Sequence, residues 1–297
     1  MNEKSCVALE SRIILLSFFS IYANMKAFTV LTPLLLALPA ISMNILLPLY
    51  VYPGTDASAW SNVTAAIAAY PQVQWQIIVN VNSGPGPSQY PDSNFVTGIS
   101  KLNSYPNVLT LGYVDTAYAK RDYSSVISDI NVYANWAYYT QTKDNISMAG
   151  IFFDDVVDNT TFTSAAQTYY HNVSSYAYAQ VPSDITPVVF NPGEIGPSQL
   201  FQYCDTMIQF EGSTQTYHND TTIKALPSAY LHQSAIIVYD ATATTNVKSL
   251  VHTMAQDGVE AVYFDYGYCT YQGSITGCYN QTSLADLEQL AAAVQAG

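Results

Sequence analysis

Short apolar runs alternate along the chain with longer segments in which apolar residues recur at helical spacing. The short runs are rich in Val, Ile, Phe and Tyr and predict eight strands, at residues 45–52, 76–82, 108–114, 149–154, 186–190, 206–211, 235–240 and 260–265. The longer segments predict a helix after each strand, near residues 57–70, 93–104, 123–140, 161–180, 197–203, 215–226, 244–257 and 283–296. Parallel strands need such crossovers, and eight strand–helix units close a sheet. The pattern therefore predicts an α/β fold of one domain, a (β/α)8 TIM barrel.

Every predicted strand becomes polar at its C-terminal end. The residues there are Tyr50, Tyr52, Asn80, Asn82, Tyr113, Asp115, Asp154, Asp155, Asn191, Gln209, Glu211, Asp240, Tyr263 and Asp265. Strands often end at polar turn residues, but these are mostly Asp, Asn, Glu and Tyr rather than Gly and Ser. In a barrel the C-terminal strand ends converge on the face that carries active sites. We therefore expect these residues to bind or act on a substrate.

Carboxyl groups supply the candidate chemistry. Cleavage of a glycosidic bond needs one carboxyl to protonate the departing oxygen and a second to stabilise or attack the sugar carbon. Asp154 in GIFFDD and Glu211 in MIQFEGS both follow aromatic strands, whose apolar surroundings can raise a carboxyl pKa. Because strand side chains alternate, we expect Asp154 to point inward and Asp155 to lie at the strand tip. Asp155 is a third candidate catalytic group, or else a turn or helix-capping residue.

Composition excludes several other classes of protein. The net charge is −13, from 9 Lys and Arg against 22 Asp and Glu, so the chain lacks the basic surface that nucleic acid requires. The 25 tyrosines suit a sugar ligand, since each offers an apolar ring face and a hydroxyl, although many also belong in a core. The sequence lacks the GxSxG, HExxH, phosphate-loop and GxGxxG motifs. We predict neither a metal nor an organic cofactor.

The N-terminal residues 1–42 predict a leader, which leaves residues 43–297 for the barrel. A lysine, an apolar stretch and small residues at Ala40 and Ser42 are typical of a secretory signal over 25–42, so Met25 could be the true start and the upstream part a gene-model extension. An uncleaved membrane anchor is the alternative, because apolar residues continue past the leader. Prolines interrupt that span, and we favour cleavage and a secreted or cell-wall monomer.

Glycosylation triplets and cysteines fit an extracellular protein. Sequons occur at Asn62, Asn145, Asn159, Asn172, Asn219 and Asn280. Cys269 and Cys278 bracket a short loop that a disulfide could close, whereas Cys204 is left as a buried thiol. The histidines, His171, His218, His232 and His252, are scattered singles without metal-ligand spacing.

Six motifs together resemble the spherulation-specific, spherulin-4-like proteins, glycoside hydrolase family 135. They are PLYVYPG (48–54), IVNVNSGPG (78–86), LGYVDTAYA (111–119), GIFFDD (150–155), FNPGE (190–194) and FEGS (210–213). The resemblance implies a (β/α)8 barrel and an endo-acting hydrolase of α-1,4-linked N-acetylgalactosamine in galactosaminogalactan-type polysaccharide. It also implies that the family's acidic residues are Asp154, Asp155 and Glu211. A partly deacetylated, cationic polymer of this kind would suit the acidic chain.

Two positions depart from the family pattern. Asp155 stands where the family usually has Glu, and Val81 replaces a proline. An aspartate is one methylene shorter, a displacement of about 1.5 Å that can cost orders of magnitude in rate if the carboxyl acts directly. The alternatives to an active hydrolase are a non-catalytic cell-wall or spore-coat polysaccharide-binding protein, and a different polysaccharide or transferase activity on the same fold.

Overall fold

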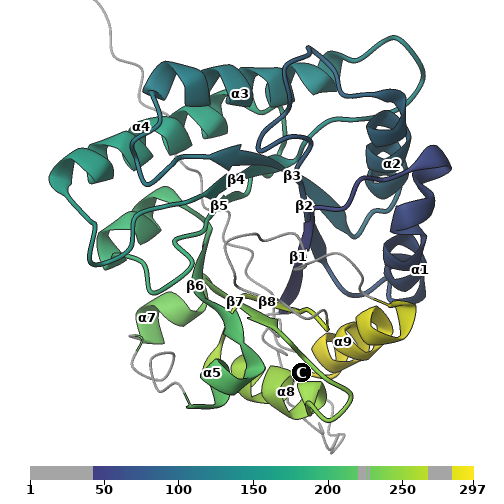
Figure 1. Ribbon diagram of the computed structural model, residues 1–297, viewed down its shortest axis with the longest axis vertical. Coiled ribbons are helices and arrows are strands. Elements are labelled where there is room, and N and C mark those ends of the chain that lie inside the picture. The colour runs from purple at the N-terminus through teal and green to yellow at the C-terminus, as the bar shows by residue number, and fades with distance from the viewer. Residues whose placement is uncertain (1–42, 220–225, 227, 267–282) are drawn as a thin grey trace, which may run out of the picture. The chain divides into compact units, whose positions relative to one another are not determined.

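The computed structural model describes residues 43–219, 226, 228–266 and 283–297. Within them, parallel strands form a closed barrel in chain order, with the last strand paired to the first (Figure 1). The strands are β1 (Asn44–Leu49), β2 (Trp75–Val79), β3 (Val108–Asp115), β4 (Gly150–Asp154), β5 (Val188–Phe190), β6 (Thr206–Ser213), β7 (Ser234–Tyr239) and β8 (Ala261–Phe264). The predicted (β/α)8 TIM-barrel fold is confirmed.

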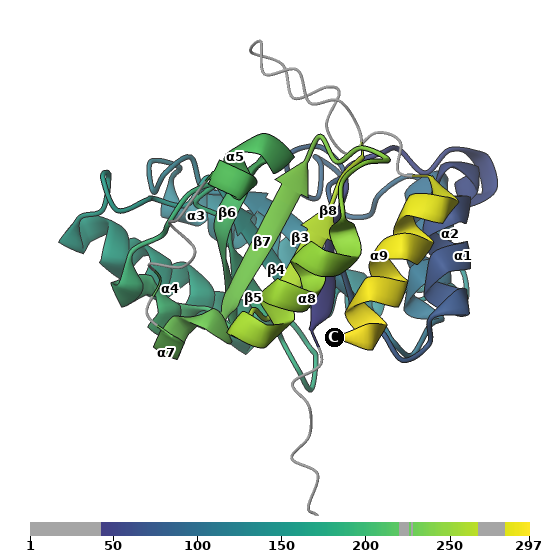
Figure 2. The same cartoon turned by 90° about the horizontal axis from the view of Figure 1, so that it is seen from below.

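Helices surround the barrel and return the chain to the start of each next strand. They are α1 (Ser61–Ala69), α2 (Ser93–Asn103), α3 (Tyr123–Asn135), α4 (Ser164–Gln180), α5 (Thr214–Asn219), α7 (Ser228–Leu231), α8 (Val247–Asp257) and α9 (Leu284–Ala296), with 3-10 turns η1 (Thr55–Trp60), η2 (Trp136–Tyr138) and η3 (Ser198–Tyr203). Helix α9 contacts both α8 and α1, so the helical layer closes as the sheet does. Figure 2 shows α8 and α9 outside β7 and β8.

Local sequence explains where the helices begin. Asp92 caps α2 and Thr163 caps α4, in each case through a side-chain oxygen that accepts from backbone N–H groups of the first turn. Asn246 does the same for α8, and this helix ends at Gly258, whose φ of 85° is the left-handed conformation that glycine adopts freely. The predicted boundaries therefore agree with the structure to within a few residues at these helices.

The structure shortens several predicted elements. Strand β1 ends at Leu49 rather than at residue 52, and β5 contains only Val188–Phe190. The helix predicted at 197–203 is the 3-10 turn η3, and part of the helix predicted at 215–226 lies outside the described residues. The leader, Cys6, Cys269, Cys278 and Asn280 also lie outside them. None of the helices in the described part of the chain combines the length and apolar character needed to cross a bilayer.

Strand β6 carries an irregularity that shapes the barrel face. Its pairing with β7 shifts between Ile208 and Phe210, so Gln209 has no partner residue on β7. Such a bulge bends the strand and re-aims the side chains on either side of it. Glu211, two residues beyond Gln209, then pairs with Ile237. The bulge therefore interrupts the regular pairing of β6 two residues before Glu211.

Candidate active site

Asp154 and Glu211 are brought together by one amide group. Asn191, directly after β5, donates from Nδ2 to Asp154 Oδ1 and to Glu211 Oε2, each at 2.9 Å. Its own Oδ1 accepts from the Gly193 N–H at 2.9 Å, which fixes the orientation of the amide. Backbone bonds from Asn191 to Phe153 and from Val156 to Asn191 hold this residue against the end of β4. The two acids thus share a rigid neighbour although 57 residues of chain separate them.

The shared nitrogen limits the distance between the two carboxylates. The two N–H bonds of a planar amide diverge by about 120°, so two 2.9 Å hydrogen bonds place the accepting oxygens about 5 Å apart. In retaining glycosidases the catalytic carboxyls lie about 5–5.5 Å apart, and in inverting enzymes about 6.5–9.5 Å. The spacing therefore matches the retaining arrangement.

The surroundings of Asp154 favour its protonated form near neutral pH. The pKa of Asp154 is raised to about 7, mainly by burial and also by the charges of Glu211 and Asp155, although a hydrogen bond from Tyr113 lowers it. The Tyr113 hydroxyl donates to Asp154 Oδ2 at 2.6 Å, and the Tyr50 ring packs edge-on against Tyr113. Both oxygens of Asp154 thus have partners.

The chain immediately after β4 is held in an unusual conformation. Asp155 has a φ of 51°, in the left-handed region that non-glycine residues seldom occupy. Its carbonyl accepts from the Thr116 hydroxyl at 2.8 Å and from the Tyr118 N–H at 2.6 Å. Thr116 Oγ1 also donates to the Asp154 carbonyl at 2.8 Å. The end of β3 is therefore locked to the end of β4.

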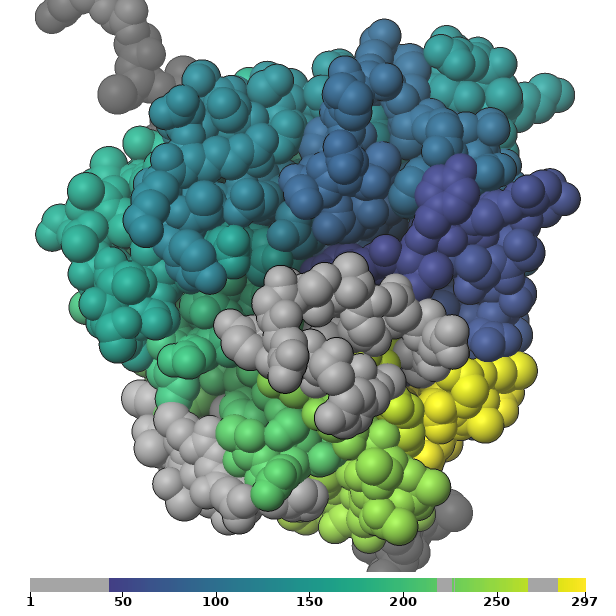
Figure 3. Space-filling view, in the orientation of Figure 1, coloured from purple at the N-terminus to yellow at the C-terminus, as the bar shows by residue number. Residues whose placement is uncertain are grey.

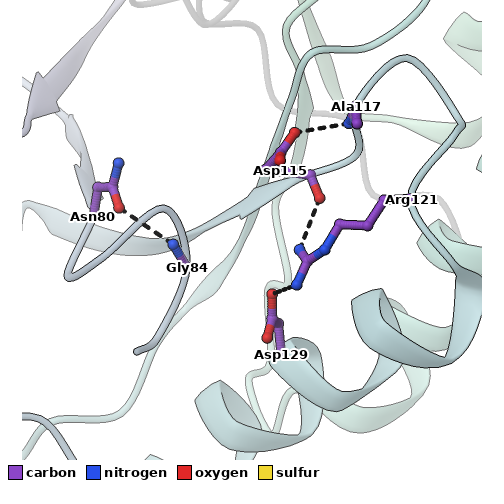
Figure 4. A network of polar contacts seen from close by, with 6 residues as sticks. All are labelled: Asn80, Gly84, Asp115, Ala117, Arg121 and Asp129. Carbon is purple, nitrogen blue, oxygen red and sulfur yellow. Dashed lines mark hydrogen bonds and ion pairs between the residues drawn. The ribbon is translucent and has the colours of Figure 1, made fainter. Parts of the chain in front are cut away.

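The loop after β3 is fixed by a polar network of its own. Ala117, Tyr118 and Ala119 all have positive φ values, between 46° and 61°. Asp115 Oδ1 accepts from the Ala117 N–H at 2.7 Å, and Arg121 donates to the Asp115 carbonyl at 2.9 Å (Figure 4). These bonds hold a left-handed stretch that its residue types do not favour, a feature that tends to occur at functional sites.

Arg121 also forms an ion pair that joins this loop to α3. Its guanidinium lies 2.7 Å from Asp129 Oδ2, and both side chains are largely buried (Figure 4). Burial raises the pKa of Asp129, and the hydrogen bond and charge of Arg121 lower it. The adjacent loop after β2 turns through a bond from the Gly84 N–H to Asn80 Oδ1 at 3.3 Å. Asn80 therefore shapes a loop beside the site.

A cavity of about 440 Å³ lies on the β6 side of the two acids. Its lining combines acidic, amide and apolar side chains and comprises Asp158, Asn159, Thr160, Gly193, Glu194, Ile195, Gln209, Phe210, Glu211, Gly212, Thr216 and Tyr239. Gln209 is 1% exposed, and neither of its amide atoms has a hydrogen-bond partner among the residues that the structure describes. In Figure 3, purple to blue residues from the N-terminal part of the barrel and green residues from its later part lie on opposite sides of the face that is viewed.

Other predicted strand-end residues differ in exposure and in their contacts. Tyr52 is half exposed and bonds Asp92 and Asn94 at the start of α2. Tyr263 and Asp265 are fully buried.

Two other predicted residues lie on loops. Asn82 lies in the turn closed by Gly84, and Asp240, with a φ of 57°, accepts from the Thr214 hydroxyl through its carbonyl. Both residues thus lie in loops that follow strands, and their contact with a substrate stays a prediction.

Sequence reasoning did not single out Tyr118 or Thr116. Tyr118 is 45% exposed, and its hydroxyl hydrogen-bonds the Asp155 carboxylate. Burial raises the pKa of Asp155, and that hydrogen bond lowers it. Both residues belong to the LGYVDTAYA motif, which was noted for its family resemblance and not for the loop it forms. The residue types of this segment do not predict its strained backbone.

The described sequons lie at the surface, and Cys204 lies in the core. Asn62, Asn145, Asn159 and Asn172 are exposed, whereas Cys204 is a buried free thiol. Asn159 differs from the other three because its Nδ2 donates to the Ile195 carbonyl at 3.1 Å at the edge of the cavity.

Comparison with solved structures shows one specific likeness. The chain is similar to Aspergillus clavatus Sph3 in complex with GalNAc, with 27% identity and a TM-score of 0.73 over 84% of this chain and 98% of that one. It is also similar to β-glucuronidase from Ruminococcus gnavus in complex with D-glucaro 1,5-lactone, at 9% identity and a TM-score of 0.50, over 85% of this chain and 49% of that one. The second likeness shows the barrel fold alone.

Comparison with sequence families agrees with the motifs. No curated protein sequence matches the chain. The model of spherulation-specific family 4 matches residues 44–294, which span the whole barrel. The resemblance carried by the six motifs is therefore confirmed, and the chain belongs to spherulation-specific family 4.

Proposed function

We propose that the protein is a secreted, endo-acting glycoside hydrolase that cleaves an amino-sugar polysaccharide with Asp154 and Glu211. The observation that carries this proposal is the Asn191 amide nitrogen that bonds both carboxylates. Two carboxyls about 5 Å apart, one of them with a pKa near 7, are the groups that glycosidic cleavage needs. The solved complex of Sph3 with GalNAc supports an amino-sugar substrate.

The roles follow from the two environments. Asp154 holds a proton near neutral pH and delivers it to the glycosidic oxygen as the bond to the sugar carbon breaks. Glu211 attacks that carbon from the other side and forms a glycosyl ester. Asp154, now ionised, takes a proton from water, whose oxygen displaces Glu211 and releases the sugar with retained configuration. Asn191 keeps both groups in place throughout, because its amide is itself fixed by Gly193.

The substrate we propose is α-1,4-linked N-acetylgalactosamine in a galactosaminogalactan-type polymer. Support comes from the family resemblance and from the net charge of −13, which suits a neutral or partly cationic polymer better than an anionic one. Secretion is supported by the signal-like residues 25–42 and by the four exposed sequons among the described residues.

The test is release of reducing ends from α-1,4-linked N-acetylgalactosamine polymer by the purified protein. We expect Asp154→Asn and Glu211→Gln to lower kcat roughly 10²–10⁴-fold. Asp257→Asn, the same change at an exposed acid near the end of α8, is the matched control and keeps wild-type activity. NMR of the first product should show the anomer of the substrate.

Two results would count against this assignment. Activity retained in both carboxyl variants would remove the catalytic pair. Binding of the polymer without any product, in the wild type as in the variants, would favour the alternative of a polysaccharide-binding protein on the same barrel.

A further inference from the structure

The loop that follows β3 holds one aromatic side chain against Asp155, the residue after the proposed acid. Tyr118 is the middle residue of the left-handed stretch Ala117–Ala119. Two groups bond this part of the chain to the end of β4. The Thr116 hydroxyl contacts the carbonyls of Asp154 and Asp155, and the Tyr118 N–H donates to the Asp155 carbonyl. Tyr118 therefore contacts Asp155, the residue that follows Asp154 in the chain.

Tyr118 is held at its backbone and at its hydroxyl. The N–H donates to the Asp155 carbonyl at 2.6 Å, and the hydroxyl bonds the Asp155 carboxylate. The side chain nevertheless remains 45% exposed, so packing in a core does not explain this arrangement. Lys120 Nζ lies over the ring, 5.9 Å from its centroid, so it is the rest of the exposed ring that can meet a ligand, at little further cost in side-chain entropy.

We propose that Tyr118 is a stacking platform for a pyranose ring next to the cleaved bond, and that Asp155 is a positioning residue that holds this platform. The proposal rests on the function proposed above and adds a subsite to it. Pyranoses offer an apolar C–H face to such a ring. Tyr118 follows β3, whereas the cavity is lined by residues after β4 and β5 and by residues of β6 that include Glu211, so in the barrel order a chain seated on both would cross the end of β4, where Asp154 lies. That path would suit internal cleavage of a polymer.

The proposal also gives Asp155 a role that its shorter side chain can perform. The Asp155 side chain reaches the Tyr118 hydroxyl from a residue with a φ of 51°. The carbonyl and the carboxylate of Asp155 both bond Tyr118. The carboxylates of Asp154 and Glu211 both bond Asn191 instead, and that of Asp154 also bonds Tyr113. An aspartate at this position therefore need not act on the substrate directly.

The experiment compares Tyr118→Ala, Tyr118→Phe and Asp155→Asn in the full chain, with kcat and KM measured on α-1,4-linked N-acetylgalactosamine polymer. We expect Tyr118→Ala to raise KM about tenfold with kcat within about twofold of wild type. Tyr118→Phe keeps the ring and should raise KM only about twofold to threefold. In Asp155→Asn the new amide oxygen still accepts a hydrogen bond from the Tyr118 hydroxyl, so this variant should raise KM no more than Tyr118→Phe does. Tyr123→Ala, at a tyrosine of similar exposure on α3, is the control.

Two outcomes would overturn the proposal. A loss of kcat in Asp155→Asn comparable to that of Asp154→Asn would make Asp155 a catalytic group. An unchanged KM in a folded Tyr118→Ala variant would remove the platform.

If the wild type releases no product, the hydrolase proposal fails, and titration of the same variants with N-acetylgalactosamine oligosaccharides tests the platform separately. A tenfold weaker affinity for Tyr118→Ala than for Tyr123→Ala would then support it, and equal affinities would refute it.

Discussion

At the scale of single residues, the proton on Asp154 is the property on which the proposed chemistry depends. Its carboxyl lies in a largely desolvated position beside two other acids, and these surroundings raise its pKa to about 7. The hydroxyl of Tyr113 acts in the opposite direction, because it donates to the ionised form. The balance leaves a group that is protonated in a large fraction of molecules at neutral pH, as a general acid requires.

Removal of the Tyr113 hydroxyl should therefore move the pH dependence of activity. Tyr113→Phe deletes a hydrogen bond that lowers the pKa of Asp154, so this pKa should rise. The alkaline limb of the kcat profile, expected near pH 7 in the wild type, should shift to higher pH, and the ratio of activity at pH 8 to that at pH 6 should increase. Tyr178→Phe, which removes a hydroxyl bonded to Asp205 instead, should leave the limb in place. A shift of the Tyr113→Phe limb to lower pH would contradict this account.

At the scale of elements, the loop between β3 and α3 depends on Arg121. This side chain bonds the carbonyl at the end of β3 and pairs with Asp129 on α3, so it ties a strand end to the helix that follows. The loop between them contains three consecutive left-handed residues, each of which is unfavourable for a non-glycine side chain. The loop is therefore stable only as long as both of its ends are fixed.

Arg121→Met should destabilise the protein and loosen this loop. Loss of one partner of a largely buried pair leaves Asp129 uncompensated, and we expect a cost of about 2 kcal/mol, or a fall in Tm of roughly 4–8 °C. The loss should be smaller at pH 4, where protonation of Asp129 removes the unpaired charge. The double variant Arg121→Met with Asp129→Asn should recover part of the stability in thermal melts. If the stability losses of the two single variants simply add in the double variant, the two side chains are not coupled.

At the scale of the whole molecule, an acidic barrel with exposed sequons suits the secreted protein that we propose. Glycans at Asn62 on α1 and at Asn172 on α4 would project from the outer helices. A glycan at Asn159 would lie at the edge of the cavity that contains Glu211, on the same nitrogen that bonds the Ile195 carbonyl. The sequons are therefore not equivalent in the folded protein.

Glycopeptide mass spectrometry of the active protein from a eukaryotic host should show which sequons carry a glycan. We expect occupied sites at Asn62 and Asn172 and an unmodified Asn159 in the active fraction. Addition of a glycan at Asn159 should lower kcat/KM on polymer by at least about tenfold, because it would obstruct the cavity. Full occupancy of Asn159 in fully active protein would contradict this expectation.

Much of the site could be predicted because Asp154 and Glu211 follow apolar strands whose order and direction the sequence indicates. The structure places both at one face of the barrel, where Asn191 bonds them. Tyr52 was assigned to the same face on the same reasoning, but β1 ends before it and its hydroxyl bonds residues at the start of α2. A polar residue just past a strand end has no fixed direction in sequence, because side-chain alternation stops with the strand.

The sequence by itself determined the barrel and the face on which its chemistry lies. Both follow from periodicity and strand direction, which are local properties of the chain. Only the tertiary structure decided that Asn191 bridges the two acids, that Tyr263 is buried, and that Tyr118 contacts Asp155. These arrangements depend on the register between strands, the bulge at Gln209 and the left-handed loop after β3. Such features arise from contacts between residues far apart in sequence, which no local pattern encodes.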